Sequence, residues 1–246
     1  MATEVYLVRH GETMFNQLNK VQGWADSPLT VKGINDLKVT AANLSQVHFD
    51  KMYSSDLKRA IDTVHLIADT NEVSEIGKIK KLPAFREVFF GTFEGDDIDE
   101  TWRKVAKAGG MKPTSDVVKI IQTLGIHDFR EATKKADPRH LAEDAEALDN
   151  RMDQAISQLA QETKGLGRVL VVSHGDFIKT LGIKYWDQVS GDHDIPFPDN
   201  GSVTRGIIDD NGKFRIINYG VKNILNDISF EVPKGDFRSE ERRVGK

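Results

Sequence analysis

Two copies of one sequence pattern constrain this 246-residue chain more than any other feature. In each copy, a run of apolar or aromatic residues leads through one polar residue into His-Gly. Residues 5–8 (VYLV) precede His10, and residues 169–172 (VLVV) precede His174. Each run predicts a short buried strand. Because ligands of an open parallel sheet bind beyond the carboxyl ends of its strands, two such strands can direct both imidazoles into one crevice.

The residues beside the two histidines suit chemistry on an anion. His10 can act as nucleophile, base, acid or metal ligand near neutral pH, and the planar fork of Arg9 suits phosphate or carboxylate. Gly11 and Gly175 follow the two histidines, and a glycine lets the backbone turn sharply or approach a ligand closely. A single strand-end histidine is more often satisfied by a neighbouring carbonyl, so the case for function depends on the second copy of the pattern.

Composition limits the classes of function. The chain is 39% hydrophobic and 29% charged, which suits one soluble globular domain with a sizeable core. A formal net charge of -4 gives no reason to expect nucleic acid or an anionic membrane as a partner. There are no cysteines, which excludes disulfides, thiolate catalysis and cysteine-based zinc or iron–sulfur sites. With no signal-like start and no apolar run long enough to span a bilayer, we expect a cytoplasmic protein.

The order of predicted elements is typical of a three-layer α/β/α fold with a mostly parallel central sheet. Thr30 is expected to cap a helix, residues 52–53 to form a second strand, and Ser55 to cap the helix that carries Arg59. A cation in the first turn of a helix opposes the helix dipole. We therefore expect Arg59 to serve a bound anion, which the helix amino terminus also attracts. The alternative is an arginine on a solvated helix face.

Three carboxyl groups compete for the role of proton donor. Glu87 precedes the aromatic, glycine-punctuated run at residues 88–95. A carboxyl packed against phenylalanines would be partly desolvated, which raises its pKa and lets it hold a proton near neutrality. Glu94 and Glu12 remain alternatives from the sequence alone.

The polar stretch after the first strand contains two side-chain amides. Asn16 and Gln22 could donate hydrogen bonds to a bound oxyanion. Solvation in a loop is the alternative for both residues.

Residues 96–138 are predicted to be an insertion between the blocks that carry the chemistry. Two helices are expected there, the first ended by Gly109 and Gly110 and the second by Gly125. Together they would form a helical lid that excludes water and selects substrate. Pro138 is expected to introduce a long helix whose apolar stripe begins at Leu141.

The last elements are predicted to be an antiparallel pair of strands. Residues 202–208 and 213–219 flank the turn sequence at residues 209–212 (DDNG), which is a strong hairpin signal. We expect residues 1–233 to form a single domain and residues 234–246 a charged, mobile tail.

Five blocks of the sequence resemble, in order, the motifs of the histidine phosphatase superfamily, the phosphoglycerate mutase-like enzymes. Any one block is a weak signal, whereas five in order are strong. The blocks are residues 7–13 (LVRHGET), 23–30 (GWADSPLT), 54–60 (SSDLKRA), 87–95 (EVFFGTFEG) and 173–175 (SHG).

The resemblance implies a phosphomonoester hydrolase that acts through a phosphohistidine on small phosphorylated metabolites, without cofactor or metal. It makes His10 the nucleophile and Glu87 the proton donor. Inorganic phosphate would be a second ligand, and the protein would be a monomer or homodimer. The residues expected around the phosphate are Arg9, Asn16, Gln22, Gly23, Arg59, His174 and Gly175.

Other functions remain open. A 2,3-bisphosphoglycerate-dependent phosphoglycerate mutase fits the same blocks, although Gln22 replaces a small hydroxyl residue and Asp176 replaces an asparagine of the mutase pattern. The predicted lid also lacks the dense arginine block of mutases. A metal hydrolase built on His10, Glu12 and His174 lacks metal-ligand spacing. A third alternative is a module that binds phosphorylated ligands without turnover.

Overall fold

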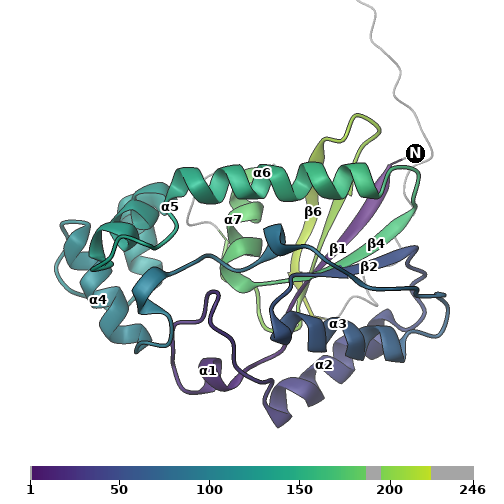
Figure 1. The fold of residues 1–246 in the computed structure, drawn as a ribbon, viewed down its shortest axis with the longest axis horizontal. Helices are drawn as coiled ribbons and strands as arrows, with labels where there is room; N and C mark the ends of the chain where they lie inside the picture. Colours follow the sequence, from purple (N-terminus) through teal and green to yellow (C-terminus); the bar gives the residue numbers. More distant parts are fainter. Residues whose placement is uncertain (1, 187–194, 223–246) are drawn as a thin grey trace, which may run out of the picture.

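A six-stranded sheet forms the centre of the computed structural model, which describes residues 2–186 and 195–222 (Figure 1). The strand order is β3-β2-β4-β1-β5-β6. Neighbouring strands are parallel from β3 to β1, whereas β5 and β6 are antiparallel. The strands are β1 (Thr3–Arg9), β2 (Lys51–Ser54), β3 (Lys80–Lys81), β4 (Arg168–Ser173), β5 (Val203–Ile208) and β6 (Phe214–Val221).

Helices cover both faces of the sheet, which confirms the predicted three-layer α/β/α fold (Figure 1). Alternate residues of a strand point to opposite faces. Leu7 and Val171 pack in the cluster that includes α6 and α7, whereas Val8 and Val172 pack in the cluster that includes α2 and α3. The four helices are α2 (Val31–Leu44), α3 (Lys58–Thr70), α6 (Ala145–Glu162) and α7 (Gly175–Tyr185).

Two of the predicted helix starts are wrong. Ser55 does not cap α3. Its hydroxyl contacts the His174 imidazole and accepts an N–H only from Leu57, the N-cap residue, which provides no side-chain cap. The long helix starts at Ala145 and not near Leu141, because the Asp137 carboxylate accepts backbone N–H groups from Leu141 and Ala142 and holds a turn there. The predicted Thr30 cap is confirmed, since the Thr30 hydroxyl accepts from the backbone of α2.

The insertion contains two helices that lie side by side at one end of the molecule (Figure 1). They are α4 (Ile98–Ala108) and α5 (Val117–Ala136). Gly109 ends α4 as predicted. Gly125 has a positive φ of 80° and breaks α5, but the helix resumes beyond it to Ala136. This helix was predicted to end at Gly125, and its second half was not predicted from the sequence.

Short helical turns complete the described chain. They are α1 (Met14–Gln17), η1 (Pro83–Phe85) and η2 (Gly91–Phe93). No helix within residues 2–186 and 195–222 is long and apolar enough to cross a membrane. The predicted tail at residues 234–246 lies outside the described residues.

Candidate active site

The structure brings the two histidines together, because β1 and β4 are adjacent parallel strands. Arg9 pairs with Ser173 at the carboxyl ends of these strands, and His10 and His174 follow directly. Their ring centroids are 5.1 Å apart. Both side chains are buried. The two copies of the sequence pattern therefore form one site, at the edge of the sheet where the repeated pattern predicts it.

The hydrogen bonds of His10 define its tautomer. Nδ1 lies 2.7 Å from the Gly11 carbonyl oxygen, which can only accept a hydrogen bond, so Nδ1 carries the proton. The lone pair is then on Nε2, which accepts from Nε of Arg59 at 3.2 Å. Burial lowers the pKa of His10 well below its ordinary value, and the charges of Arg59 and Arg9 lower it further. His10 is thus a neutral imidazole with its nucleophilic nitrogen facing a cation.

Arg59 is buried and fixed on three sides. Its Nη2 donates to the Gly23 carbonyl at 2.7 Å, and Nη1 donates to the Ala25 carbonyl at 3.1 Å and to Asp26 at 3.0 Å. The alternative of a solvated surface arginine is therefore wrong. Because its Nε–H is aimed at Nε2 of His10, the guanidinium places positive charge beside the unprotonated nitrogen of that ring.

His174 is fixed by Ser55. The Ser55 hydroxyl lies 2.7 Å from Nε2 of His174, whereas the buried Nδ1 has no hydrogen-bond partner among the described residues. Burial, and then the charge of Arg59, lower the pKa of His174 well below its ordinary value. A hydroxyl that donates to Nε2 leaves the proton of a neutral ring on Nδ1. His174 can therefore present a neutral N–H donor to a ligand.

Arg9 depends on the glycine at position 175. A Cβ at Gly175 would lie 2.9 Å from Nε of Arg9 and 3.0 Å from its Cζ, so only glycine allows the guanidinium to lie against α7. Nη1 of Arg9 donates to the Pro198 carbonyl at 2.6 Å. Its buried Nε has no partner in the described part of the chain.

Glu87 is buried at the amino terminus of α7. Its two carboxyl oxygens accept backbone N–H groups from Val88, Asp176 and Phe177 at 2.8–3.0 Å. Burial, and then the charge of the Asp176 carboxylate, raise the pKa of Glu87, while the three N–H groups oppose the rise. The carboxyl group can thus hold a proton, and the helix terminus stabilises the carboxylate once the proton leaves.

The two competing carboxylates have other contacts. Glu94 accepts backbone N–H groups from Gly23, Trp24 and Ala25, as well as one from Phe90. It therefore organises the loop whose carbonyls hold the guanidinium of the site. Glu12 accepts from the Thr30 hydroxyl at 2.7 Å and pairs with Lys32 at 3.3 Å.

Asn16 and Gln22 are joined through Thr13. The Thr13 hydroxyl lies 3.0 Å from Oδ1 of Asn16 and 2.9 Å from Oε1 of Gln22. The buried Nε2 of Gln22 has no partner within residues 2–186 and 195–222. The side-chain amide of Gln22 therefore presents N–H donors beside Gly23. The Gly23 carbonyl in turn accepts a hydrogen bond from Arg59.

The site combines a neutral imidazole with a free lone pair, two arginines, N–H donors that have no partner among the described residues, and a protonatable carboxyl. Such donors stabilise negative charge on a transferred phosphoryl group without reorganisation. In the described ranges, no group of three or more His, Asp or Glu side chains is placed to hold a metal ion. The set His10, Glu12 and His174 is not gathered, because Glu12 is bound at the start of α2.

Comparison with known proteins adds the family. The sequence profile of the histidine phosphatase superfamily (branch 1) matches residues 5–116 and 119–221. The chain belongs to this superfamily. Membership of this superfamily gives the five blocks and the paired strand ends a common explanation.

Several individual proteins are also similar to this chain in sequence or in structure. A 2,3-bisphosphoglycerate-dependent phosphoglycerate mutase of Borrelia garinii subsp. bavariensis is 29% identical over 197 residues, which is 76% of this chain and 79% of the relative. The structure of phosphoglycerate mutase from Bacillus anthracis str. Sterne has a TM-score of 0.82 and 33% identity, over 92% of this chain and 96% of that one. A putative alpha-ribazole-5'-P phosphatase from Escherichia coli str. K-12 substr. MG1655 has a TM-score of 0.66 and 23% identity, over 90% and 98%, and shows the fold alone.

Several residues that hold the candidate active site were not identified from the sequence. Asp26 pairs with Arg59, and Asn200 donates to the His10 carbonyl at 2.9 Å. Asp26 lies within the block at residues 23–30, so a search of the blocks for charge partners could have found it. Asn200 gives no local signal, because its contact forms only when β5 pairs with β1.

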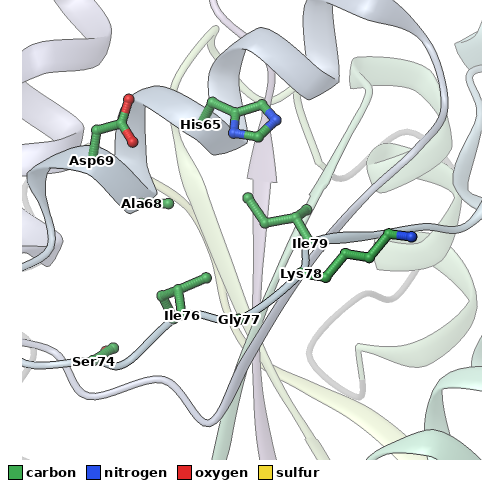
Figure 2. Close-up of a pocket in the computed structure, with 8 residues that line it drawn as sticks. All are labelled: His65, Ala68, Asp69, Ser74, Ile76, Gly77, Lys78 and Ile79. Carbon is green, nitrogen blue, oxygen red and sulfur yellow. The ribbon is translucent and has the colours of Figure 1, made fainter.

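A separate surface hollow lies along α3 (Figure 2). His65 and Asp69 border it from the helix, and Lys78 and Ile79 border it from the following loop. At 1.5 Å per residue, His65 lies about 9 Å along the helix from Arg59. None of the donors of the candidate active site lines this hollow.

Proposed function

We propose that this chain is a phosphomonoester hydrolase that acts through a phosphohistidine on small phosphorylated metabolites. The observation that carries the proposal is the neutral His10, whose Nε2 lone pair faces the Arg59 guanidinium beside the second imidazole. Metal and cofactor are not part of the proposed reaction. Inorganic phosphate, as product, is proposed to bind the same donors.

In the first step, Nε2 of His10 attacks phosphorus and the bond to the leaving oxygen breaks. Arg9, Arg59 and His174 donate to the phosphoryl oxygens, where charge is greatest. Glu87 gives its proton to the leaving alkoxide. General acid catalysis of this kind contributes about 10² to 10⁴ in rate.

In the second step, water attacks the phosphohistidine. The Glu87 carboxylate accepts a proton from this water, the N–P bond breaks, and the lone pair returns to His10. Phosphate is released, and Glu87 is again protonated. The three N–H groups that contact Glu87 support both states, because they stabilise the carboxylate that exists between the two steps.

A 2,3-bisphosphoglycerate-dependent mutase is the second candidate, because two relatives with 29% and 33% identity carry phosphoglycerate mutase names. Two features favour a hydrolase instead. Asp176 stands where the mutase pattern has asparagine, and its carboxylate pairs with Arg130, so a buried lid arginine is engaged within the protein. The lid also lacks a dense arginine block that would grip a second anionic group.

The substrate can be sought with a panel of phosphorylated metabolites scored by kcat/KM. Incubation with 3-phosphoglycerate and a trace of 2,3-bisphosphoglycerate separates the two candidates. Phosphate release without isomerisation is expected. Rapid isomerisation without phosphate release would establish the mutase. We propose action in the cytoplasm, by a monomer or homodimer in which residues 96–138 act as the lid.

His10→Ala tests the nucleophile. Phosphatase activity is expected to fall by on the order of 10⁴-fold or more, as it does when other covalent enzymes lose their nucleophile. Acid-labile, base-stable labelling of the unmutated protein by a ³²P-phosphomonoester, absent from the variant, would identify the phosphohistidine. Activity of the variant near the unmutated level would overturn the assignment, as would full loss of activity in a chelator.

A further inference from the structure

The segment that carries Glu87 has little regular structure of its own. Only residues 83–85 form a helical turn, and the next helical turn starts at residue 91. Backbone carbonyls outside helices and sheets still need hydrogen-bond donors when they are buried. The donors for this segment come from side chains elsewhere in the chain.

Arg151 of α6 supplies most of these donors. Its Nη1 donates to the carbonyls of Ala84 at 2.9 Å and Arg86 at 2.8 Å, and its Nη2 donates to the carbonyl of Glu87 at 3.2 Å. Three contacts from one rigid guanidinium fix the direction of the chain on both sides of the Glu87 side chain. A lysine could not reproduce them, because an ammonium has three donors on one atom.

Glu143 fixes the guanidinium in turn. Its two oxygens accept from Nε and Nη2 of Arg151, each at 2.7 Å, so all five donors of the arginine have acceptors. The Glu143 backbone N–H also donates to the Phe89 carbonyl at 2.8 Å. The pair is nearly buried, with 13% and 9% of the side chains exposed. A buried, bidentate pair of this kind holds its geometry far better than an exposed one.

The opposite side of Glu87 is fixed by α7. Asp176 and Phe177 donate to the carboxyl group, and the Arg151 guanidinium lies 5.0 Å from the Phe177 ring. The same arginine therefore contacts the segment that carries the carboxyl group and a residue that binds the carboxyl group. A small rotation of the segment would break the hydrogen bonds between Glu87 and α7.

We infer that Arg151, oriented by Glu143, is a positioning residue that keeps the Glu87 carboxyl group at the amino terminus of α7 for proton transfer. This inference rests on the proposed function, because it assigns a role relative to the proton donor. All five donors of Arg151 have protein acceptors, so we assign it no contact with the substrate.

The test compares two substrates in Arg151→Lys. An alkyl phosphate needs a proton on its leaving oxygen, whereas p-nitrophenyl phosphate has a leaving group that departs without one. We expect kcat/KM for the alkyl phosphate to fall about 10- to 100-fold, the range typical of residues that orient a reacting group. The fall for p-nitrophenyl phosphate should be about 3-fold or less, because the proton contributes little there.

A double variant shows whether Arg151 acts through Glu87. Glu87→Gln alone should produce the same dependence on the leaving group, and adding Arg151→Lys to it should cause little further loss with the alkyl phosphate. Arg168→Lys is the matched control, since Arg168 pairs with Glu4 at 2.9 Å near the amino end of β4. It should affect both substrates alike.

Three outcomes would overturn the inference. One is an equal loss with both substrates in Arg151→Lys, which a merely structural role predicts. A second is a full additional loss in the double variant. The third is a Glu87→Gln variant with no dependence on the leaving group, which would remove the proposed proton donor as well. If Arg151→Lys does not fold, Glu143→Gln gives the same comparison with a smaller change at the arginine.

Discussion

The two halves of the site are held in different ways. The histidines are held by the sheet, because His10 and His174 extend adjacent parallel strands whose pairing reaches Arg9 and Ser173. Glu87 lies in a segment without strand or helix, and it is held by the Arg151 side chain and by backbone N–H groups at the start of α7.

This difference indicates that the spacing of the histidines tolerates most substitutions, whereas the position of Glu87 does not. Strand pairing involves backbone groups, so most substitutions leave the spacing of the histidines unchanged. The backbone carbonyls around Glu87 depend on one particular side chain, that of Arg151, and its loss should change the position of the proposed proton donor. We therefore expect substitutions around Glu87 to alter which leaving groups are accepted, and substitutions around the histidines to alter the rate for all substrates.

Glu87→Gln should have the largest effect on this comparison. With an alkyl phosphate, kcat/KM, which reports the phosphorylation step and not the later hydrolysis of the phosphohistidine, should fall by about 10² to 10⁴ because the leaving alkoxide is no longer protonated. With p-nitrophenyl phosphate the fall should be much smaller. Steady-state kinetics with both substrates measure the difference, and an equal fall would show that Glu87 is not the proton donor.

Glu94→Ala should disturb the loop that holds Arg59. Four backbone N–H groups would lose their acceptor, including those of Gly23 and Ala25. We expect the free energy of unfolding to fall by about 1–3 kcal/mol. Urea denaturation measures this free energy. Glu94→Gln keeps one oxygen acceptor, so its free energy of unfolding should lie between those of the unmutated protein and Glu94→Ala. An unchanged midpoint in Glu94→Ala would contradict this role.

Ser55→Ala should weaken the orientation of His174. Without the hydroxyl at Nε2, the proton of the neutral ring is no longer directed to Nδ1, and kcat/KM should fall about 2- to 10-fold for good and poor leaving groups alike. Ser54→Ala is the matched control, because the buried Ser54 hydroxyl has no hydrogen-bond partner among the described residues. Equal effects of the two substitutions would contradict the role of Ser55.

Asp176→Asn should shift the pH profile with little change in maximal rate. Glu87 must be protonated to act, so kcat/KM falls as pH rises through its pKa. The Asp176 charge helps to raise this pKa, and its removal should move the alkaline limb to lower pH. Arg130→Gln, which removes the partner of Asp176, should move the limb in the opposite direction. If the pH profile moves in neither variant, the charge of Asp176 does not influence the pKa of Glu87.

The fold and the histidine half of the site could be predicted from the sequence because their signals are local. Apolar runs predict β1 and β4, and the parallel pairing of such strands places His10 beside His174. The hairpin of β5 and β6 follows from its turn sequence, and the pairing is confirmed.

The contacts that hold Glu87, the proposed proton donor, could not be predicted from the sequence in the same detail. Arg151 lies on a helix whose apolar stripe is readable, but its own contacts with the segment at residues 84–87 form only after α6 packs against η1. The role of Ser55 was misjudged for a related reason. A serine before a helix is usually a cap, and only the tertiary structure shows that an imidazole takes its hydroxyl.

The 5.1 Å between the two imidazole rings is close to the distance of about 4.8 Å that separates neighbouring strands in any sheet. Backbone hydrogen bonding sets the strand spacing, and the contacts of each ring with Gly11, Arg59 and Ser55 set the rest. A protein engineer who wishes to change the specificity of the site should therefore leave the strand ends and these contacts intact. Redesign is better directed at the helices that follow, which do not determine the spacing of the two strands.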